Sequence, residues 1–316
     1  MSASFLVLAI PASVAFVCIV WHSAKMRGVR TTVAFFAALI GFGLLRGNLV
    51  YWITNGKPPY RFEMSVMTVG RTGVVEAMGW CIAVYISWSI AERLLAGRKP
   101  HEDNLLVQLL FSCSMMMGFA LLMETAAGRM DWWHWSPPRG MKASPALRDV
   151  ERGITEWFSV GFDFLTPWLL FTSARLKNRA WALLGLIPFP VHFGFHEIRR
   201  VVLDHGGIHL SQKALEGQHL IKLNRVSHFA MLAVAVILPY FLFVARRPSP
   251  DYRAPLSTSR ETWIARLDVI ALGIVVLTVA TGLFGVAKEG ELVIFALPVL
   301  AAGLYAWWWS ERRAPV

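Results

Sequence analysis

GVVEAMGWCIAVYISWSIAERLL, residues 73–95, is one of the long apolar segments that decide the fold of this chain. A helix needs about 20 apolar residues to cross the hydrocarbon core of a bilayer, and this segment meets that length. Only helices and closed barrels satisfy every backbone group within lipid, and the segment is too long and continuous for a barrel strand. The sequence therefore predicts an all-α, polytopic transmembrane helical bundle.

Segments of this kind recur along the chain, and we expect eight or nine spans in one transmembrane domain covering residues 1–316. The first segment lacks the preceding basic residues of a signal peptide, so we interpret it as a retained span. The candidate spans are residues 4–22, 32–53, 73–95, 104–126, 154–174, 180–198, 226–245, 264–286 and 290–309.

The composition excludes several other classes of protein. Hydrophobic residues make up 56% of the 316 residues and charged residues 16%, against about 25% charged in soluble domains. A soluble enzyme, a disordered chain and a disulfide scaffold are therefore excluded. The net charge of +11 is compatible with nucleic-acid binding or with membrane topology. Because the cations cluster between apolar segments, we favour membrane topology and expect no nucleic-acid partner.

Cationic clusters follow the odd-numbered segments and predict the orientation of the chain. Lys and Arg are enriched on the cytoplasmic side of membrane proteins. This rule places the N-terminus outside and the C-terminus in the cytoplasm, in the inner membrane of the cell. The clusters are Lys25/Arg27/Arg30, Arg93/Arg98/Lys99, Arg175/Lys177/Arg179, Arg246/Arg247 and Arg312/Arg313.

Ionisable residues inside the expected spans gather in one half of the membrane. Such residues are costly in lipid and are functional candidates by default. Because successive spans alternate in direction, the following residues share the outer half: Arg46, Glu76, Glu124, Glu156, Asp163, His192, His196, Glu197 and His228. The last two spans contribute nothing comparable, since Arg266 and Asp268 lie at the opposite end. A polar plug, with Arg46 and Arg71 neutralising two acids, is one interpretation. We favour a cavity, because the acids and histidines outnumber the arginines.

The spacing of residues adds detail to this group. Glu156 and Asp163, seven residues apart, share one helix face, and Glu76 and Trp80 place a carboxylate beside an indole. The loop METAAGRMDWWHWSPP, residues 123–138, adds further tryptophans. Trp132, Trp133 and Trp135 could line an apolar entrance, with Asp131 and His134 as polar groups. Tryptophans also anchor proteins at membrane interfaces, and both interpretations stay open.

Carboxylate acid–base chemistry on a lipid fits these residues. A carboxylic acid in an apolar site can protonate an isolated double bond, while an ionised carboxylate and aromatic rings stabilise the resulting cation. We expect a hydratase or isomerase type of enzyme that needs no cofactor. The candidate catalytic residues are Glu76, Glu124, Glu156 and Asp163. The candidate substrate-binding residues are Arg46, Arg71, Trp80, Asp131, Trp133, His134, Trp135 and Trp157.

The stretch METAAGRMDWWHW, residues 123–135, followed by EWF at residues 156–158, resembles a known family. It is similar to the integral-membrane proteins of bacterial and archaeal carotenoid biosynthesis, including the carotenoid hydratases. In these proteins an acidic residue precedes a W-x-W tract, and a later tryptophan-ended segment opens the next span. The resemblance implies a carotenoid or other polyisoprenoid substrate. It also implies that the pocket is formed by, or lies beside, Glu124, Trp133, Trp135 and Trp157.

Two alternatives to this chemistry remain. His192 and His196, four residues apart, could share a transition metal with His228, as in metal-dependent lipid hydrolases and oxidases. A transporter with a polar intramembrane site is the other alternative, because Pro167 and Pro188 could break helices. In the leading interpretation the partners are the bilayer and a lipid or isoprenoid substrate. The oligomeric state does not follow from the sequence.

Overall fold

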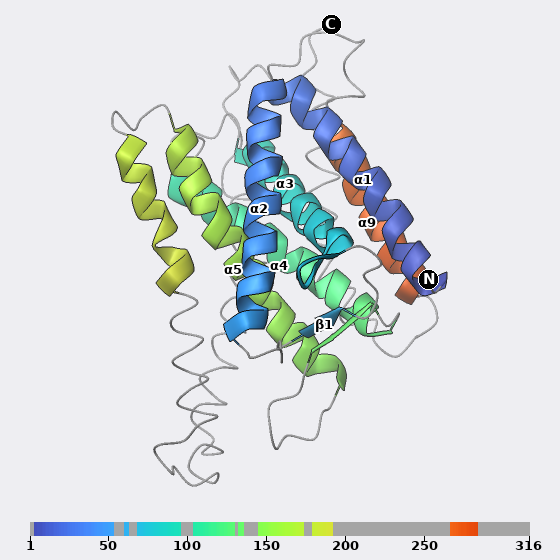
Figure 1. Cartoon of the computed structure of the whole chain (residues 1–316). Helices are drawn as coiled ribbons and strands as arrows, with labels where there is room; N and C mark the ends of the chain where they lie inside the picture. Colours follow the sequence, from blue (N-terminus) through green and yellow to red (C-terminus); the bar gives the residue numbers. More distant parts are fainter. Residues whose placement is uncertain are drawn as a thin grey trace, which may run out of the picture.

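The computed structural model describes residues 3–53, 60–62, 68–95, 104–129, 132–135, 145–173, 179–191 and 266–283. Within these ranges the fold is all-α, with four short strands at one end of the helices (Figure 1). The helices are α1 (Ala3–Arg27), α2 (Val29–Ile53), α3 (Val74–Leu95), α4 (Leu105–Arg129), α5 (Pro145–Thr172), η1 (Arg179–Leu186) and α9 (Leu267–Leu283).

Among the described helices, three are long and apolar enough to cross a membrane: Leu8–Arg27 in α1, Val29–Trp52 in α2 and Val74–Arg93 in α3. Apolar side chains of α1 and α2 point outward; Val17 is 60% exposed and Val33 is 62% exposed. Large exposed apolar surfaces mark contact with a membrane or partner, and here they fit lipid. The described residues thus support a transmembrane helical protein.

The later candidate spans are described in part. The segment 180–198 begins as the 3-10 helix η1, and its residues from 192 onward lie outside the described ranges. Helix α9 lies within the segment 264–286. Segments 226–245 and 290–309 lie outside the described residues.

Helices α1 and α2 form a tight hairpin. The single residue Gly28 separates them, with a φ of 84°. This left-handed conformation is strained for residues with a side chain but open to glycine. Thr32 completes the turn, since its hydroxyl donates to the carbonyl oxygen of Gly28 at 2.9 Å. The chain therefore reverses direction between the last turn of α1 and the first turn of α2.

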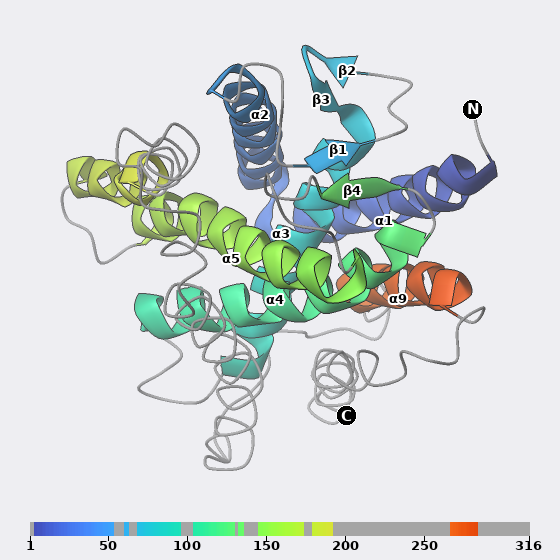
Figure 2. The ribbon, with the colours of Figure 1, turned by 90° about the horizontal axis from the view of Figure 1, so that it is seen from below.

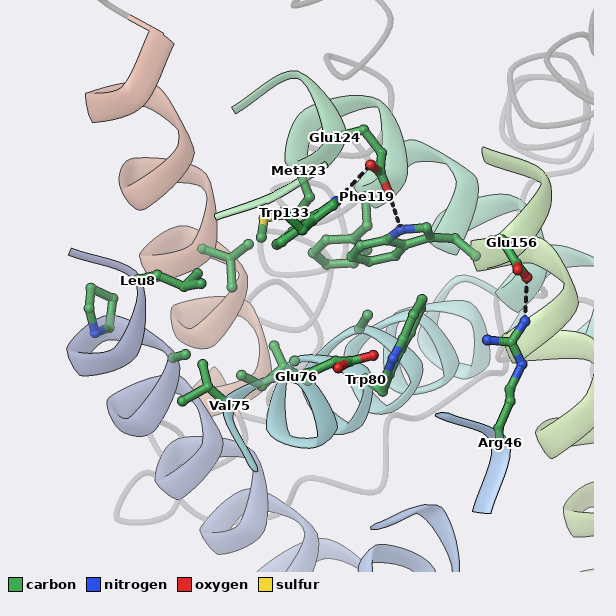
Figure 3. A pocket seen from close by; sticks show the side chains of 17 residues that line it. Leu8, Arg46, Val75, Glu76, Trp80, Phe119, Met123, Glu124, Trp133 and Glu156 are labelled. Carbon is green, nitrogen blue, oxygen red and sulfur yellow. Dashed lines mark hydrogen bonds and ion pairs between the residues drawn. The ribbon is translucent and has the colours of Figure 1, made fainter. Parts of the chain in front are cut away.

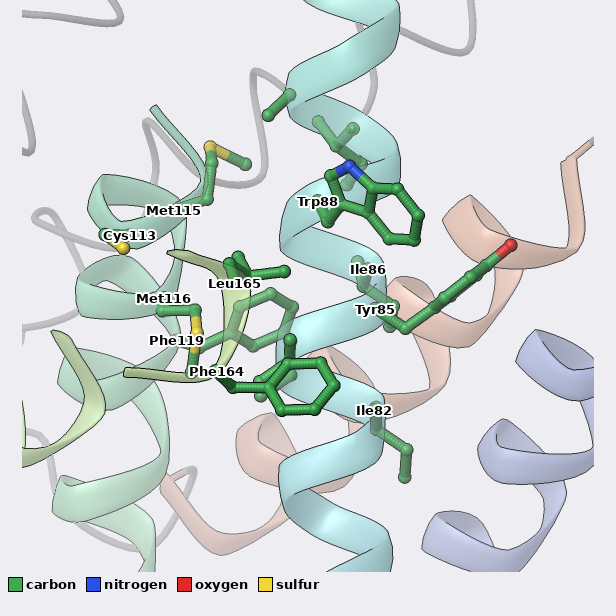
Figure 4. Packing of buried hydrophobic residues seen from close by; sticks show 14 of the residues in the cluster. Ile82, Tyr85, Ile86, Trp88, Cys113, Met115, Met116, Phe119, Phe164 and Leu165 are labelled. Carbon is green, nitrogen blue, oxygen red and sulfur yellow. The ribbon is translucent and has the colours of Figure 1, made fainter. Parts of the chain in front are cut away.

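Helix α3 passes through the centre of the bundle and contributes more buried residues to the main apolar core than any other described helix. Its Tyr85 and Ile86 are completely buried. Met116 and Phe119 of α4 and Phe164 of α5 approach the same helix in the view of Figure 4. Burial of large side chains such as these stabilises a helix by about 1.5–3 kcal/mol each in water. Lipid reduces this driving force, so close packing has to hold the helices together.

An aromatic contact joins α2 to α3 and α5. Phe35 of α2 stacks on Trp88 of α3, with ring centroids 5.1 Å apart. Its edge also meets the ring of Trp168 on α5, at 5.0 Å. Aromatic pairs of this geometry contribute about 0.5–1.5 kcal/mol beyond their buried area. The middle of the bundle is therefore filled.

The short strands cover the end of the bundle where α3 begins (Figure 2). β1 (Tyr60–Phe62) pairs antiparallel with β4 (Trp133–Trp135), so that Phe62 opposes Trp133. β2 (Thr68–Val69) and β3 (Thr72–Gly73) form a second pair that leads directly into α3. The sequence predicts only connecting loops here. The β1–β4 pairing joins the segment between α2 and α3 to the segment between α4 and α5, and it fixes the position of Trp133.

Candidate functional site

A pocket of about 100 Å³ lies where α3 begins and α4 ends (Figure 3). Its walls come from α1, α2, α3, α4, β4, α5 and α9. Leu8 and Pro11 of α1 and Val275 of α9 form an apolar part of the wall. We call the site the Glu–Trp pocket after the charged and indole side chains that also line it: Arg46, Glu76, Trp80, Glu124, Trp133, Glu156 and Trp157.

Two indoles fix the carboxylate of Glu124. Trp133 Nε1 donates a hydrogen bond to Oε2, and Trp157 Nε1 donates one to Oε1, both at 2.8 Å. Glu124 is only 3% exposed, so these bonds replace water that a solvated carboxylate would hold. One donor comes from β4 and the other from α5. The carboxylate therefore has a defined place in the pocket, with both oxygens acting as acceptors.

An ion pair crosses from α2 to α5 at the pocket. Arg46, which is 4% exposed, donates through Nη2 to Oε2 of the partly buried Glu156. A buried pair of this kind is costly to desolvate, and removal of either partner would leave a charge in an apolar environment. The pair therefore fixes the position of Glu156 and balances its charge.

The wall supplied by α3 combines a carboxylate with an indole face. Glu76 and Trp80 lie one helical turn apart and share this wall. The ring of Trp80 lies 4.9 Å from that of Trp157, centroid to centroid, at an interplanar angle of 57°. Gly79 lies between Glu76 and Trp80 in the sequence, and a Cβ added to it would meet nothing within 4 Å. The wall is therefore open beside the two tryptophans.

Two of the predicted site residues lie in the described part of the chain but do not line the pocket. Asp163 is buried in α5 but does not line it. Its seven-residue separation from Glu156 amounts to about 10 Å along a helix, which puts it well beyond the pocket wall. Arg71 is exposed in the β2–β3 turn, with its guanidinium carbon 4.7 Å from the ring centroid of Tyr51. Neither side chain is among those that line the Glu–Trp pocket.

The remaining predicted residues are described only in part or not at all. For His134 and Trp135 the structure gives the backbone, paired with Arg61 and Tyr60 of β1. Asp131 lies outside the described residues, as do the proposed metal ligands His192, His196 and His228. Within the described ranges, no group of three His, Cys, Asp or Glu side chains is placed to hold a metal ion.

A second polar group, which the sequence analysis did not predict, lies at the opposite end of the bundle. Asp268 of α9 is completely buried and accepts hydrogen bonds from Arg93 and Ser89 of α3, at 2.8 and 2.7 Å. Arg93 also contacts His22 of α1 at 2.8 Å, and the other ring nitrogen of His22 lies 2.7 Å from the Tyr85 hydroxyl. We call these five residues the Asp268 cluster. It joins α1, α3 and α9.

A cation of the chain itself fills the space beside this cluster. The guanidinium carbon of Arg27 lies 3.8 Å from the ring centroid of Trp88. Arg27 Nη2 pairs with Glu92 at 2.5 Å, and Gln108 donates to the second oxygen of Glu92 at 3.1 Å. Arg and Asp residues at the ends of the apolar segments are the signal in the sequence for this cluster, because ions near lipid are expected to pair. It did not indicate which of these residues meet.

Comparison with models of protein families, with curated proteins and with solved structures finds no match for this chain.

Proposed function

We propose that this chain is a membrane enzyme that acts on an isoprenoid lipid by acid–base chemistry of carboxylates in the Glu–Trp pocket. One observation carries the proposal. Three carboxylates, from Glu76, Glu124 and Glu156, line one small pocket whose other walls are apolar or aromatic apart from the Arg46 guanidinium. Apolar walls suit a hydrocarbon, and carboxylates can exchange protons with it or stabilise positive charge.

The three carboxylates have different surroundings and are assigned different roles. Glu124 accepts two indole hydrogen bonds and stabilises a cation in the pocket. Glu156 pairs with Arg46 and completes the wall. We assign the proton transfer to Glu76, which stands beside the indole of Trp80 on α3. The faces of Trp80 and Trp157 add cation–π stabilisation.

The proposed reaction balances with water as the second reactant. The carboxylic acid of Glu76 gives its proton to one carbon of an isolated double bond, and the π electrons form the new C–H bond. The neighbouring carbon becomes a tertiary cation, held by Glu124 and the indole faces. A water oxygen bonds to this carbon, and the proton released returns to the carboxylate of Glu76. In the isomerisation, the Glu76 carboxylate instead takes a proton from another carbon next to the cation. The double bond then re-forms at a new position.

The size of the pocket fits the end of a lipid rather than its whole length. An engineered cavity of about 150 Å³ in another protein holds benzene, so about 100 Å³ admits roughly four or five non-hydrogen atoms. The dimethyl-substituted double bond that ends an isoprenoid chain has this size. The chain would continue along Leu8, Pro11 and Val275 toward the bilayer.

The resemblance to carotenoid-biosynthesis proteins supports a carotenoid or another polyisoprenoid as substrate. The resemblance places Glu124, Trp133 and Trp157 in or beside a pocket, and here both indole N–H groups donate to the Glu124 carboxylate. We further propose that the pocket lies in the outer half of the inner membrane, with the N-terminus outside and the C-terminus in the cytoplasm.

The test is expression of the chain in a host that makes linear polyisoprenoids, followed by solvent extraction and mass spectrometry. The unaltered chain should yield a product heavier by one water or an isomer with a shifted absorption spectrum. Glu76→Gln should abolish the product, because the amide cannot carry the proton. Glu92→Gln is the matched control, since this carboxylate lies at the opposite end of α3, and it should leave the product unchanged. Equal product from Glu76→Gln and the unaltered chain would refute the assignment.

A further inference from the structure

The α1–α2 hairpin carries cations but no carboxylate of its own, because residues 1–62 contain no Asp or Glu. Two of its cations point into the bundle and find acids on other helices. Arg27 pairs with Glu92 of α3. Arg46 pairs with Glu156 of α5. The other two basic residues of these helices are Lys25 and Arg30.

Lys25 and Arg30 lie on the surface, on either side of Gly28. Both are exposed, and neither side chain forms an ion pair or a hydrogen bond with any residue that the structure describes. Arg27, between them in the sequence, is drawn into the bundle, where its guanidinium carbon lies 3.8 Å from the ring centroid of Trp88. The positive charge that the α1–α2 turn presents to its surroundings therefore comes from Lys25 and Arg30.

The depth of the turn matches that of lipid headgroups. The membrane-crossing segment of α1 ends at Arg27 and that of α2 begins at Val29, so the turn lies at the boundary of the hydrocarbon core. Figure 1 shows it at the end of the bundle opposite to β1. This is the end that we propose to be cytoplasmic. Anionic lipids give the cytoplasmic surface of a membrane a negative potential, which attracts cations of the protein.

Exposed apolar side chains lie one helical turn from each of the two cations, on the side of the hydrocarbon core. Trp21 precedes Lys25 by four residues on α1 and is 45% exposed. Val33 follows Arg30 by three residues on α2 and is 62% exposed. Residues at these spacings share a helix face. Both helices therefore offer a cation at the level of the headgroups and apolar surface at the level of the acyl chains.

We propose that the α1–α2 turn binds an anionic phospholipid, with the headgroup phosphate at Lys25 and Arg30 and the acyl chains along Trp21 and Val33. A guanidinium group binds phosphate oxygens through paired N–H donors, and an ammonium group adds a compact positive charge. An acidic peptide would match the two cations but not the exposed apolar side chains beside them. This inference is independent of the Glu–Trp pocket and of the proposed reaction.

The test compares phosphatidylglycerol with phosphatidylcholine, both labelled on the same acyl chain. Each lipid is titrated into the full chain in a non-ionic detergent, and binding is measured by energy transfer from the tryptophans to the label. A Lys or Arg near an anionic membrane surface favours binding about fivefold, so two should favour phosphatidylglycerol about 25-fold. High salt should reduce this preference, because it screens exposed charges. Equal binding of the two lipids, or a preference that salt does not change, would overturn the proposal without any variant.

Variants at exposed cations locate the binding. Lys25→Gln and Arg30→Gln should each weaken phosphatidylglycerol binding about fivefold, and the double variant should bind the two lipids equally. Arg71→Gln is the matched control, because it removes an exposed cation at the opposite end of the bundle, and it should leave the preference unchanged. A preference that survives in the double variant, or that falls as much in Arg71→Gln, would refute the assignment to the turn.

Competition separates a lipid from a soluble anion. Unlabelled phosphatidylglycerol should displace the labelled lipid. Glycerol phosphate and a short polyglutamate peptide should not displace it at the same concentration, because they lack the acyl chains that contact Trp21 and Val33. Displacement by either of them as effective as that by the unlabelled lipid would show that the turn recognises charge alone, and the lipid would be the wrong ligand.

Discussion

At one end of the bundle the Arg27 guanidinium fills the space between Trp88 and Glu92, whereas at the other end the space between Trp80 and Glu124 is hollow. Both ends use tryptophan and carboxylate side chains from α3 and its neighbours. In the filled end these groups bind each other and a cation of the chain, which joins helices. In the hollow end they hold positions around a cavity. The difference shows that a polar group within a bundle indicates a binding site only where it leaves space.

The largest change in stability is expected at the filled end, from Asp268→Asn. Asp268 is completely buried and accepts hydrogen bonds from Arg93 and Ser89. Loss of its charge breaks the buried ion pair with Arg93, which costs about 3–5 kcal/mol. The thermal unfolding midpoint in detergent should fall clearly. An unchanged midpoint would mean that the Asp268 cluster does not hold α1, α3 and α9 together.

Glu124→Gln should have a smaller effect on stability and a large effect on function. The amide keeps one acceptor oxygen, but its NH₂ group would face one of the two indole N–H donors. One unsatisfied buried donor costs about 1–3 kcal/mol. We expect a modest fall in the unfolding midpoint together with loss of product. A fall as large as that of Asp268→Asn would show that this end of the bundle is structural as well.

Substitutions at Gly79 test the Glu–Trp pocket directly. An added Cβ there meets nothing within 4 Å, and glycine inside a helix costs about 0.5–1 kcal/mol relative to alanine. Gly79→Ala should therefore raise the unfolding midpoint slightly. Gly79→Leu should occupy the pocket, and we expect it to abolish product formation in a folded protein. Full product formation by Gly79→Leu would place the substrate elsewhere.

The smallest effect is expected from Glu92→Gln. The side chains of Arg27 and Glu92 are 18% and 32% exposed, and ion pairs that reach solvent contribute about 0–1 kcal/mol. Arg27 also keeps its contact with the Trp88 ring. The unfolding midpoint should stay within a degree or two of that of the unaltered chain. A large fall would show that this pair is shielded from solvent in the membrane.

The sequence was enough to predict the helical class and most of the charged part of the pocket. Apolar length predicted helices because lipid offers the backbone no other partners. Alternating helix direction placed Arg46, Glu76, Glu124 and Glu156 at one depth, and the structure brings these four around one pocket. Depth alone does not determine which face of a helix points inward. Asp163 was therefore grouped with them, although it lies about two turns further along α5.

Other features depended on contacts that periodicity does not encode. The β1–β4 pairing joins residues in two separate connections, and each strand has only three residues, too few for a recognisable pattern. The Asp268 cluster joins α1, α3 and α9. Its members lie near the ends of apolar segments, where a side chain in contact with lipid headgroups gives the same sequence pattern. The metal alternative rests on residues outside the described ranges. For the transporter alternative, Pro167 lies inside helix α5, which continues to Thr172.

The wide spread of the pocket walls along the chain affects its biogenesis. Leu8 and Val275 belong to helices near opposite ends of the sequence, yet both line the same cavity. At roughly 5–20 residues per second, the ribosome completes the first wall many seconds before the last. Until α9 is inserted, the carboxylates of this site have no closed chamber around them. A nascent or truncated protein that ends before this helix would therefore be inserted in the membrane but lack the assembled site.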